Sequence, residues 1–133
     1  MYLEKTLNSV ENNSFVVEIF GLGYVGFPLA VKLASSGFNV IGIDVNSKRV
    51  QRLRENELMD SELSLQKQFL ESKNHGTLTI DESPKGSELA KIGIICVPTP
   101  IPEDNVKSDV FVKNAVENFL EFAKKGDVLI LES

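Results

Sequence analysis

FVVEIFGLGYVGFP, residues 15–28, is the stretch that most clearly indicates the fold, because an apolar run leads directly into three spaced glycines. Gly21, Gly23 and Gly26 form the pattern G-x-G-x-x-G, which is typical of a dinucleotide-binding loop between a strand and a helix. The first glycine permits a tight turn, the second lets the backbone approach a pyrophosphate, and the third lets the helix pack closely on the sheet. The pyrophosphate would lie at the helix N-terminus, where unpaired N–H groups and the helix dipole favour an anion.

The residues on both sides of the glycines support this interpretation. Residues 15–20 are mostly β-branched or aromatic, as in a short buried strand. Apolar residues then recur on one helical face, and Gly37 fits the end of that helix. A second apolar run, residues 40–43, ends on Asp44, about 20 residues after the glycines, where this fingerprint expects an acid.

Asp44 predicts which dinucleotide is bound. A carboxylate at the tip of the second strand accepts hydrogen bonds from the adenosine ribose and repels a 2′-phosphate, so NAD is favoured over NADP. The alternative is an Asx residue that opens the turn at Asn46 and Ser47. Lys48 and Arg49 keep NADP open as a minor option, although a planar guanidinium at Arg49 is better suited to stacking on adenine.

The rest of the chain continues the alternation of strands and helices. We expect helices over residues 47–55, 57–74, 83–90 and 110–124, and strands over residues 77–80, 92–97 and 128–131. Pro98-Thr99-Pro100 must form a loop at the carboxyl end of a strand, where open α/β sheets bind ligands. The pattern predicts an α/β fold with a doubly wound parallel sheet of the Rossmann type over residues 15–133, after an N-terminal arm of residues 1–14.

Composition excludes several classes of function. The formal charge is −5 and no basic cluster appears, which argues against nucleic-acid or anionic-membrane partners. No apolar run approaches the length of a membrane helix, and the single cysteine allows no internal disulfide, so we expect a cytoplasmic protein. We expect no metal site, because His75 is the only histidine and no Cys-x-x-Cys exists.

Four motifs resemble the N-terminal NAD-binding domain of the UDP-glucose/GDP-mannose dehydrogenase family. They are GLGYVGFPLA at residues 21–30, Asp44 with Arg49, CVPTP at residues 96–100, and the terminal LES. The Glu-Ser ending is more similar to the branch that oxidises UDP-N-acetylmannosamine or related N-acetylhexosamines than to the UDP-glucose branch. The resemblance implies a two-step, NAD-dependent oxidation of a sugar C6 alcohol to a carboxylate through a cysteine-bound intermediate.

The resemblance also implies roles for individual residues. Tyr24 and Val25 would lie against the cofactor in the glycine loop, and Asp44 and Arg49 would hold its adenosine end. Pro98 and Thr99 would belong to the cofactor site on the nicotinamide side, although the Thr99 hydroxyl could instead satisfy the turn. Glu132 would face the active cleft or be a solvated terminal carboxylate.

The family's catalytic cysteine belongs to later segments that this sequence does not contain, and Cys96 does not match it. We therefore expect Cys96 to be a small core residue, and the chain to be a fragment without the domain that binds the UDP-sugar. The parent would be a homo-oligomer. Two alternatives are a stand-alone NAD-binding regulatory module and the Rossmann domain of another NAD(P) dehydrogenase, such as the β-hydroxyacid type.

Overall fold

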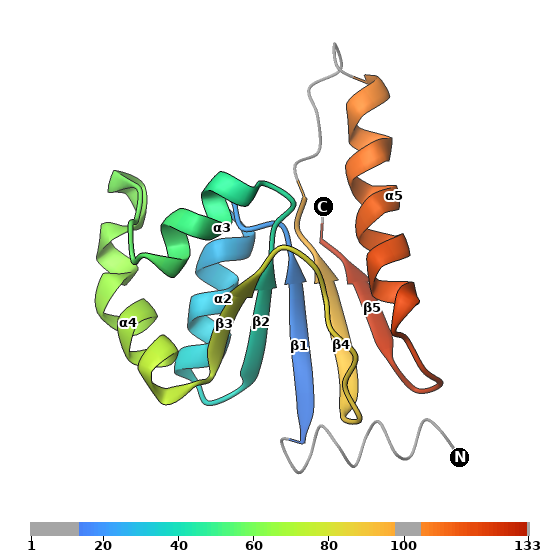
Figure 1. The fold of residues 1–133 in the computed structure, drawn as a ribbon, viewed down its shortest axis with the longest axis horizontal. Coiled ribbons are helices and arrows are strands. Elements are labelled where there is room, and N and C mark those ends of the chain that lie inside the picture. The colour runs from blue at the N-terminus through green and yellow to red at the C-terminus, as the bar shows by residue number, and fades with distance from the viewer. Residues whose placement is uncertain (1–13, 98–104, 133) are drawn as a thin grey trace.

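The computed structural model describes residues 14–97 and 105–132, which form one parallel sheet with helices on both faces (Figure 1). The strands are β1 (Phe15–Phe20), β2 (Asn39–Ile43), β3 (Leu78–Asp81), β4 (Ala90–Ile95) and β5 (Val128–Leu131). The helices are α2 (Gly26–Ser35), α3 (Ser47–Arg54), the 3₁₀ helix η1 (Asp60–Leu65), α4 (Gln66–His75) and α5 (Asn105–Glu121). The predicted doubly wound α/β fold is confirmed.

The order of the strands creates a ligand-binding edge. The sheet order is β3-β2-β1-β4-β5, so the chain moves outward on one side of β1 and then returns to its other side at β4. In parallel register, Phe20 stands opposite Ile43 on β2 and Ile95 on β4. The carboxyl ends of these three strands therefore meet at the topological switch point, where open α/β sheets bind their ligands.

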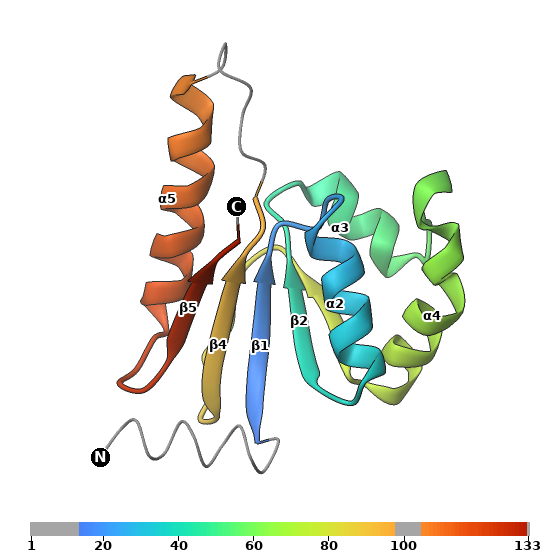
Figure 2. The ribbon, with the colours of Figure 1, turned by 180° about the vertical axis from the view of Figure 1, so that it is seen from behind.

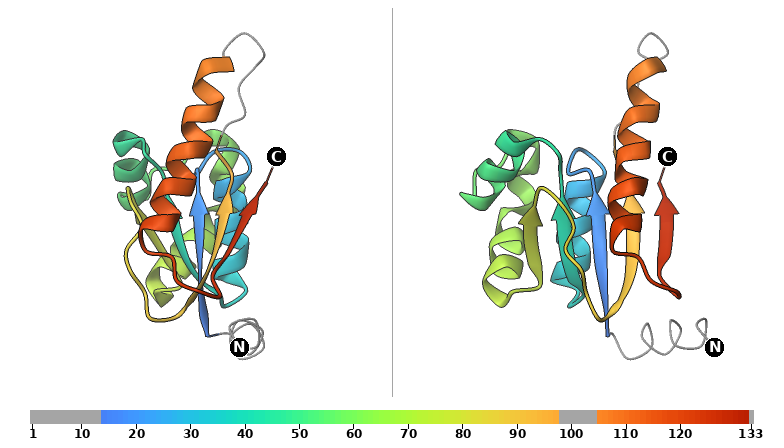
Figure 3. Two further views of the ribbon diagram at one scale, coloured as in Figure 1. Left: turned by 90° about the vertical axis from the view of Figure 1, so that its right-hand side faces the viewer. Right: turned by 45° about the vertical axis from the view of Figure 1, so that its right-hand side comes forward.

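The two faces of the sheet are covered by different helices (Figures 2 and 3). On one face, α2 packs against β1 and β2 and contacts α4, with the Phe27 and Phe69 ring centroids 5.4 Å apart. On the other face, Phe119 of α5 meets Phe20 of β1 edge-to-face at 6.2 Å. The helix that carries the glycine loop and α5 consequently flank the switch point from opposite sides.

One predicted helix is absent. Residues 82–89 form bends and irregular chain between β3 and β4, so the expected helix over residues 83–90 is wrong. An isolated segment of this length gains too few hydrogen bonds to offset helix nucleation, and Gly86 lies within it. A Cβ added at Gly86 would lie 3.3 Å from the Phe122 ring, which indicates that this connection packs closely against the end of α5.

Several other boundaries differ from the predictions. Strand β4 spans Ala90–Ile95 rather than residues 92–97, and α5 begins at Asn105 rather than at residue 110. The helix expected over residues 57–74 is two elements, η1 and α4. Asn46 caps α3, because its Oδ1 accepts hydrogen bonds from the N–H groups of Lys48 and Arg49. Helix α5 ends at Glu121, before the predicted end at residue 124, so Phe122 falls beyond the helix and is 38% exposed.

Candidate functional site: a cavity at the switch point

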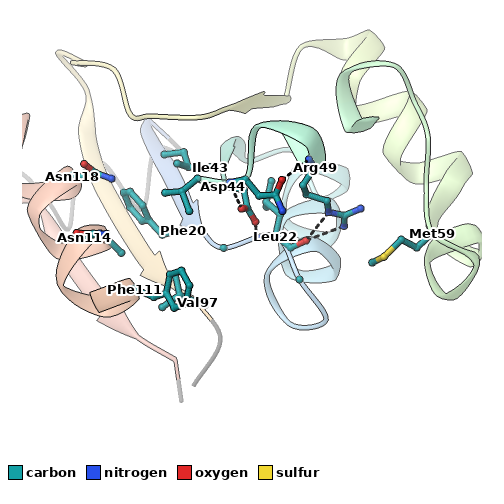
Figure 4. Close-up of a pocket in the computed structure, with 15 residues that line it drawn as sticks. Phe20, Leu22, Ile43, Asp44, Arg49, Met59, Val97, Phe111, Asn114 and Asn118 are labelled. Carbon is teal, nitrogen blue, oxygen red and sulfur yellow. Dashed lines mark hydrogen bonds between the residues drawn. The ribbon is translucent and has the colours of Figure 1, made fainter. Parts of the chain in front are cut away.

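A cavity of about 330 Å³ opens at the carboxyl ends of β1, β2 and β4 (Figure 4). The glycine loop, the residues that follow β2, Val97 after β4, Met59 and one face of α5 line it. Residues far apart in the sequence are therefore brought to one edge of the sheet, as the sequence predicted for the glycines and Asp44.

The three glycines have distinct steric environments. Gly21 has a φ of +99°, and a Cβ there would lie 2.8 Å from the carbonyl oxygen of Cys96. A Cβ at Gly26 would lie 1.7 Å from the carbonyl oxygen of Gly21, so the first turn of α2 can approach the loop only with glycine here. A Cβ at Gly23 would meet nothing within 4 Å, which leaves open space above the loop backbone. This space leaves room for a ligand group to approach the loop backbone, as the fingerprint expects of its second glycine.

Asp44 joins the end of β2 to the glycine loop. Its Oδ2 accepts a hydrogen bond from the Leu22 N–H at 2.9 Å, and its Oδ1 accepts one from the Asn46 N–H at 2.9 Å. The second contact is the Asx turn that the sequence analysis gave as an alternative. Asp44 makes this turn and also lines the cavity. The half-buried carboxylate is thus oriented before any ligand arrives.

Arg49 of α3 donates hydrogen bonds to the same loop. Its Nε and Nη2 donate hydrogen bonds to the Leu22 carbonyl oxygen at 3.2 and 2.9 Å, and it forms an ion pair with Glu62 of η1. The guanidinium carbon also lies 5.2 Å from the centroid of the Phe27 ring. One face of the guanidinium is therefore covered by the Phe27 ring, and Arg49 also lines the cavity.

The cavity wall opposite Arg49 was not predicted from the sequence. It consists of Phe20, Ile43 and Val97 from the strand ends, with Phe111, Asn114, Ala115 and Asn118 from α5. Residues 111, 114, 115 and 118 recur at the spacing of one helical face, so this signal was available. The wall offers apolar surface beside two side-chain amides, a combination suited to a flat heterocycle with polar edges.

Cys96 lies directly after β4 and is buried. Its N–H donates to the Phe20 carbonyl oxygen at 2.7 Å, and its Cβ lies 3.2 Å from where a Cβ on Gly26 would be. Burial, with a smaller contribution from the Glu132 carboxylate, raises the pKa of its thiol to about 11. A thiol in this state is a poor nucleophile, because the thiolate is the reactive form.

Comparison with known proteins agrees with this geometry. The family model described as the NAD-binding domain of the UDP-glucose/GDP-mannose dehydrogenase family matches residues 15–133. This chain belongs to that family. The match begins at the first residue of β1 and covers every described helix and strand, so the predicted resemblance is confirmed and NAD is the cofactor of the domain.

Similar proteins include two archaeal enzymes named UDP-N-acetyl-D-mannosamine dehydrogenase. The enzyme of Methanococcus aeolicus is 38% identical over 136 aligned positions that cover 100% of this chain, and that of Methanocaldococcus jannaschii is 36% identical over 96% of it. The chain spans about 30% of the length of each. Similarity to the N-acetylmannosamine branch was expected from the Glu-Ser ending.

Solved structures show the same relation. The UDP-N-acetyl-mannosamine dehydrogenase of Staphylococcus aureus superposes with a TM-score of 0.77 at 32% identity over 89% of this chain and 28% of its own. A UDP-glucose dehydrogenase from Pyrobaculum islandicum superposes with a TM-score of 0.72 at 25% identity over the same shares. The family fold is therefore shared across branches that are named for different sugars.

The remaining predicted site residues either do not line the cavity or lie outside the described residues. Tyr24 and Val25 protrude from the glycine loop, 85% and 54% exposed, and do not line the cavity. Glu132 is exposed just after β5, where its N–H donates to the Ile95 carbonyl oxygen at 3.0 Å. Pro98, Thr99, Ser133 and residues 1–13 of the N-terminal arm lie outside the described residues.

The described ranges, residues 14–97 and 105–132, lack two further features. Within them, no helix has the length and apolar character that a membrane crossing requires. The same ranges hold no group of three or more His, Cys, Asp or Glu side chains arranged to bind a metal ion.

Proposed function

We propose that this chain supplies the NAD site of a nucleotide-sugar 6-dehydrogenase, which oxidises the C6 alcohol of a UDP-sugar to the uronic acid. The observation that carries the proposal is the joint placement of Asp44 and the open backbone at Gly23 on one cavity. Bound NAD supplies the hydride acceptor, and the residues of this chain bind and orient it.

The cavity supports an assignment of subsites. The Asp44 carboxylate, held by Leu22 and Asn46, would accept hydrogen bonds from the adenosine ribose hydroxyls. The open space at Gly23 would take the pyrophosphate, close to the N-terminus of α2. The apolar wall with the Asn114 and Asn118 amides would take the adenine ring. Tyr24, Val25, Pro98 and Thr99 remain predicted cofactor contacts, and Glu132 a predicted residue of the active cleft.

The sugar is proposed from the relatives rather than from the cavity. Their names favour UDP-N-acetylmannosamine or a related UDP-N-acetylhexosamine. We propose that this chain alone does not turn over the sugar, because Cys96 is buried with a raised pKa of about 11. The nucleophile would then lie in the part of the relatives' length that this chain does not span. A cytoplasmic, homo-oligomeric parent remains our expectation. Family membership does not favour the regulatory-module or β-hydroxyacid alternatives.

The first experiment replaces the acid at the tip of β2. Asp44→Ala should weaken NAD binding about tenfold to a hundredfold in a calorimetric titration, because hydrogen bonds to a charged group are lost. It should also narrow the discrimination against NADP. Asp60→Ala is a matched control, since Asp60 is exposed and does not line the cavity. An unchanged affinity of the Asp44 variant would reject the ribose assignment.

The second experiment adds a side chain in the open space at Gly23. Gly23→Val should abolish NAD binding while the domain remains folded, because its added side chain meets open space in the protein but occupies the pyrophosphate position. Circular dichroism would verify the fold, and calorimetry the loss of binding. A folded variant that still binds NAD would remove the glycine loop from the site.

A further inference from the structure

Glu62 of η1 is a buried carboxylate beside the cavity, only 4% exposed. Its Oε1 accepts hydrogen bonds from Nη1 of Arg49 at 3.0 Å and from the Met59 N–H at 3.0 Å. Its Oε2 pairs with Nη2 of Arg49. A carboxylate so far from water persists only when such partners compensate its charge, so Glu62 and Arg49 form one neutral unit.

That unit is linked to Asp44 through Leu22 of the glycine loop. The Leu22 N–H donates to Asp44, and the carbonyl oxygen of the same residue accepts from Arg49 (Figure 4). Leu22 is thus held at both of its backbone groups, by an acid from the end of β2 and a base from α3. Asp44 and Arg49 both line the cavity.

The position of Arg49 poses a selectivity problem. In dinucleotide folds an arginine near the end of the second strand accommodates the 2′-phosphate of NADP. Arg49 stands five residues after Asp44, at the start of α3, and its side chain is 13% exposed. An uncompensated guanidinium there would attract the 2′-phosphate and oppose the repulsion from Asp44. Glu62 removes this attraction because it neutralises the guanidinium and fixes it on the Leu22 carbonyl.

We propose that Glu62 is a specificity-determining residue that acts through Arg49 and withholds the positive charge of Arg49 from the 2′ position of the adenosine ribose. Discrimination against NADP then has two parts, the carboxylate of Asp44 and the pairing of Arg49 with Glu62. This inference rests on the proposed NAD site and assigns a role to a residue outside the glycine fingerprint.

The test is the ratio of NADP to NAD affinity in Glu62→Gln. The introduced amide would keep an oxygen for the Met59 N–H but would carry no charge to balance Arg49. We expect the affinity for NADP relative to NAD to rise about tenfold, because one nearby unit charge becomes uncompensated. A loss of packing alone would weaken both ligands together and leave the ratio unchanged. An unchanged ratio would overturn the proposal.

Glu57→Gln is the matched control. Glu57 is exposed, lies in the connection between α3 and η1 that precedes Glu62, and does not line the cavity. The substitution Glu57→Gln makes the same chemical change and the same change in net charge as Glu62→Gln. The ratio of NADP to NAD affinity of this variant should therefore equal that of the wild type. A rise of equal size in Glu57→Gln would attribute the effect to net charge and overturn the role of Glu62.

If Glu62→Gln does not fold, Glu62→Asp decides the question. The shorter side chain keeps the charge but withdraws it from the guanidinium by one methylene, so we expect a smaller rise in the ratio of NADP to NAD affinity. The absence of any rise would contradict the proposal. Failure of the proposed function is distinguished by the wild type. If the folded wild-type chain binds neither NAD nor NADP, the proposed site itself is rejected. If the wild type prefers NAD and the Glu62 variant has the same ratio of NADP to NAD affinity, only this inference is rejected.

Discussion

Two buried ion pairs, one beside the cavity and one between β1 and β4, differ in how completely their charges are hydrogen-bonded. Arg49 and Glu62, beside the cavity, share their polar atoms with each other and with the backbone of Leu22 and Met59. Lys91 and Glu18, beneath α5, lie 3.5 Å apart with both side chains 0% exposed and no hydrogen-bond partner among the described residues. Besides the Glu18 carboxylate, Lys91 has the Phe119 ring nearby, 4.8 Å from its Nζ to the centroid.

The difference indicates what each pair contributes. Burial of an ion pair gains stability only when geometry and further hydrogen bonds repay desolvation, and the pair beneath α5 lacks those bonds within the described part of the chain. The pair beside the cavity is fully bonded and fixes the loop that would hold the cofactor. We therefore expect the Lys91–Glu18 pair to affect stability alone, and the Arg49–Glu62 pair to affect ligand binding as well.

The largest effect is expected from Lys91→Met. It leaves the Glu18 carboxylate uncompensated in the interior, so the free energy of unfolding should fall by about 3–5 kcal/mol. Urea denaturation followed by circular dichroism measures this. The double variant Lys91→Met, Glu18→Gln removes both charges and should recover most of the loss. A single variant as stable as the wild type would show that Glu18 needs no counter-charge.

Arg49→Met makes the same kind of change in the other pair and should have a smaller effect on stability, about 1–3 kcal/mol. Glu62 keeps its bond from the Met59 N–H and lies beside a cavity that water can enter. The same variant should weaken NAD binding about tenfold or more, because the Leu22 carbonyl loses a charged donor. Calorimetry with NAD should find no such loss in Lys91→Met. Equal losses of affinity in both variants would erase the distinction between the pairs.

The smallest effect is a pH dependence. Burial raises the pKa of the Glu18 carboxyl above its ordinary value of 4.5, and Lys91 offsets only part of this. The folded state therefore holds the proton more tightly than the unfolded state, so this group's contribution to stability is complete below the ordinary value and is lost as pH rises through the raised value. Relative to the double variant, the wild type should become less stable as pH rises from below 4.5 through the raised pKa of Glu18. A constant difference across this range would contradict the raised pKa.

The sequence predicted the features that depend on local chemistry. The glycine loop, Asp44 at the tip of β2 and the parallel sheet follow from strand and helix periodicity and from the steric freedom of glycine. The sequence did not predict Glu62 as a partner of Arg49, because that contact depends on how η1 folds back against α3. It also missed the α5 wall of the cavity, where side chains from β1, β2, β4 and α5 converge only in the tertiary structure.

The expected helix over residues 83–90 failed for a related reason. Its local pattern was acceptable, with Pro84 at a first turn, but no helical face was required by the packing of the sheet. Gly86 instead lies against Phe122, in a contact that local propensity cannot reveal. Elements with a strong apolar period were predicted well, and short connections were determined by what they contact.

A calorimetric titration of the 133-residue chain with NAD, repeated with NADP, tests the proposed cofactor site. We expect saturable binding of NAD and weaker binding of NADP, because Asp44 lines the cavity and Glu62 neutralises Arg49. Equal affinity for the two dinucleotides, or binding of neither by the folded chain, would contradict this expectation.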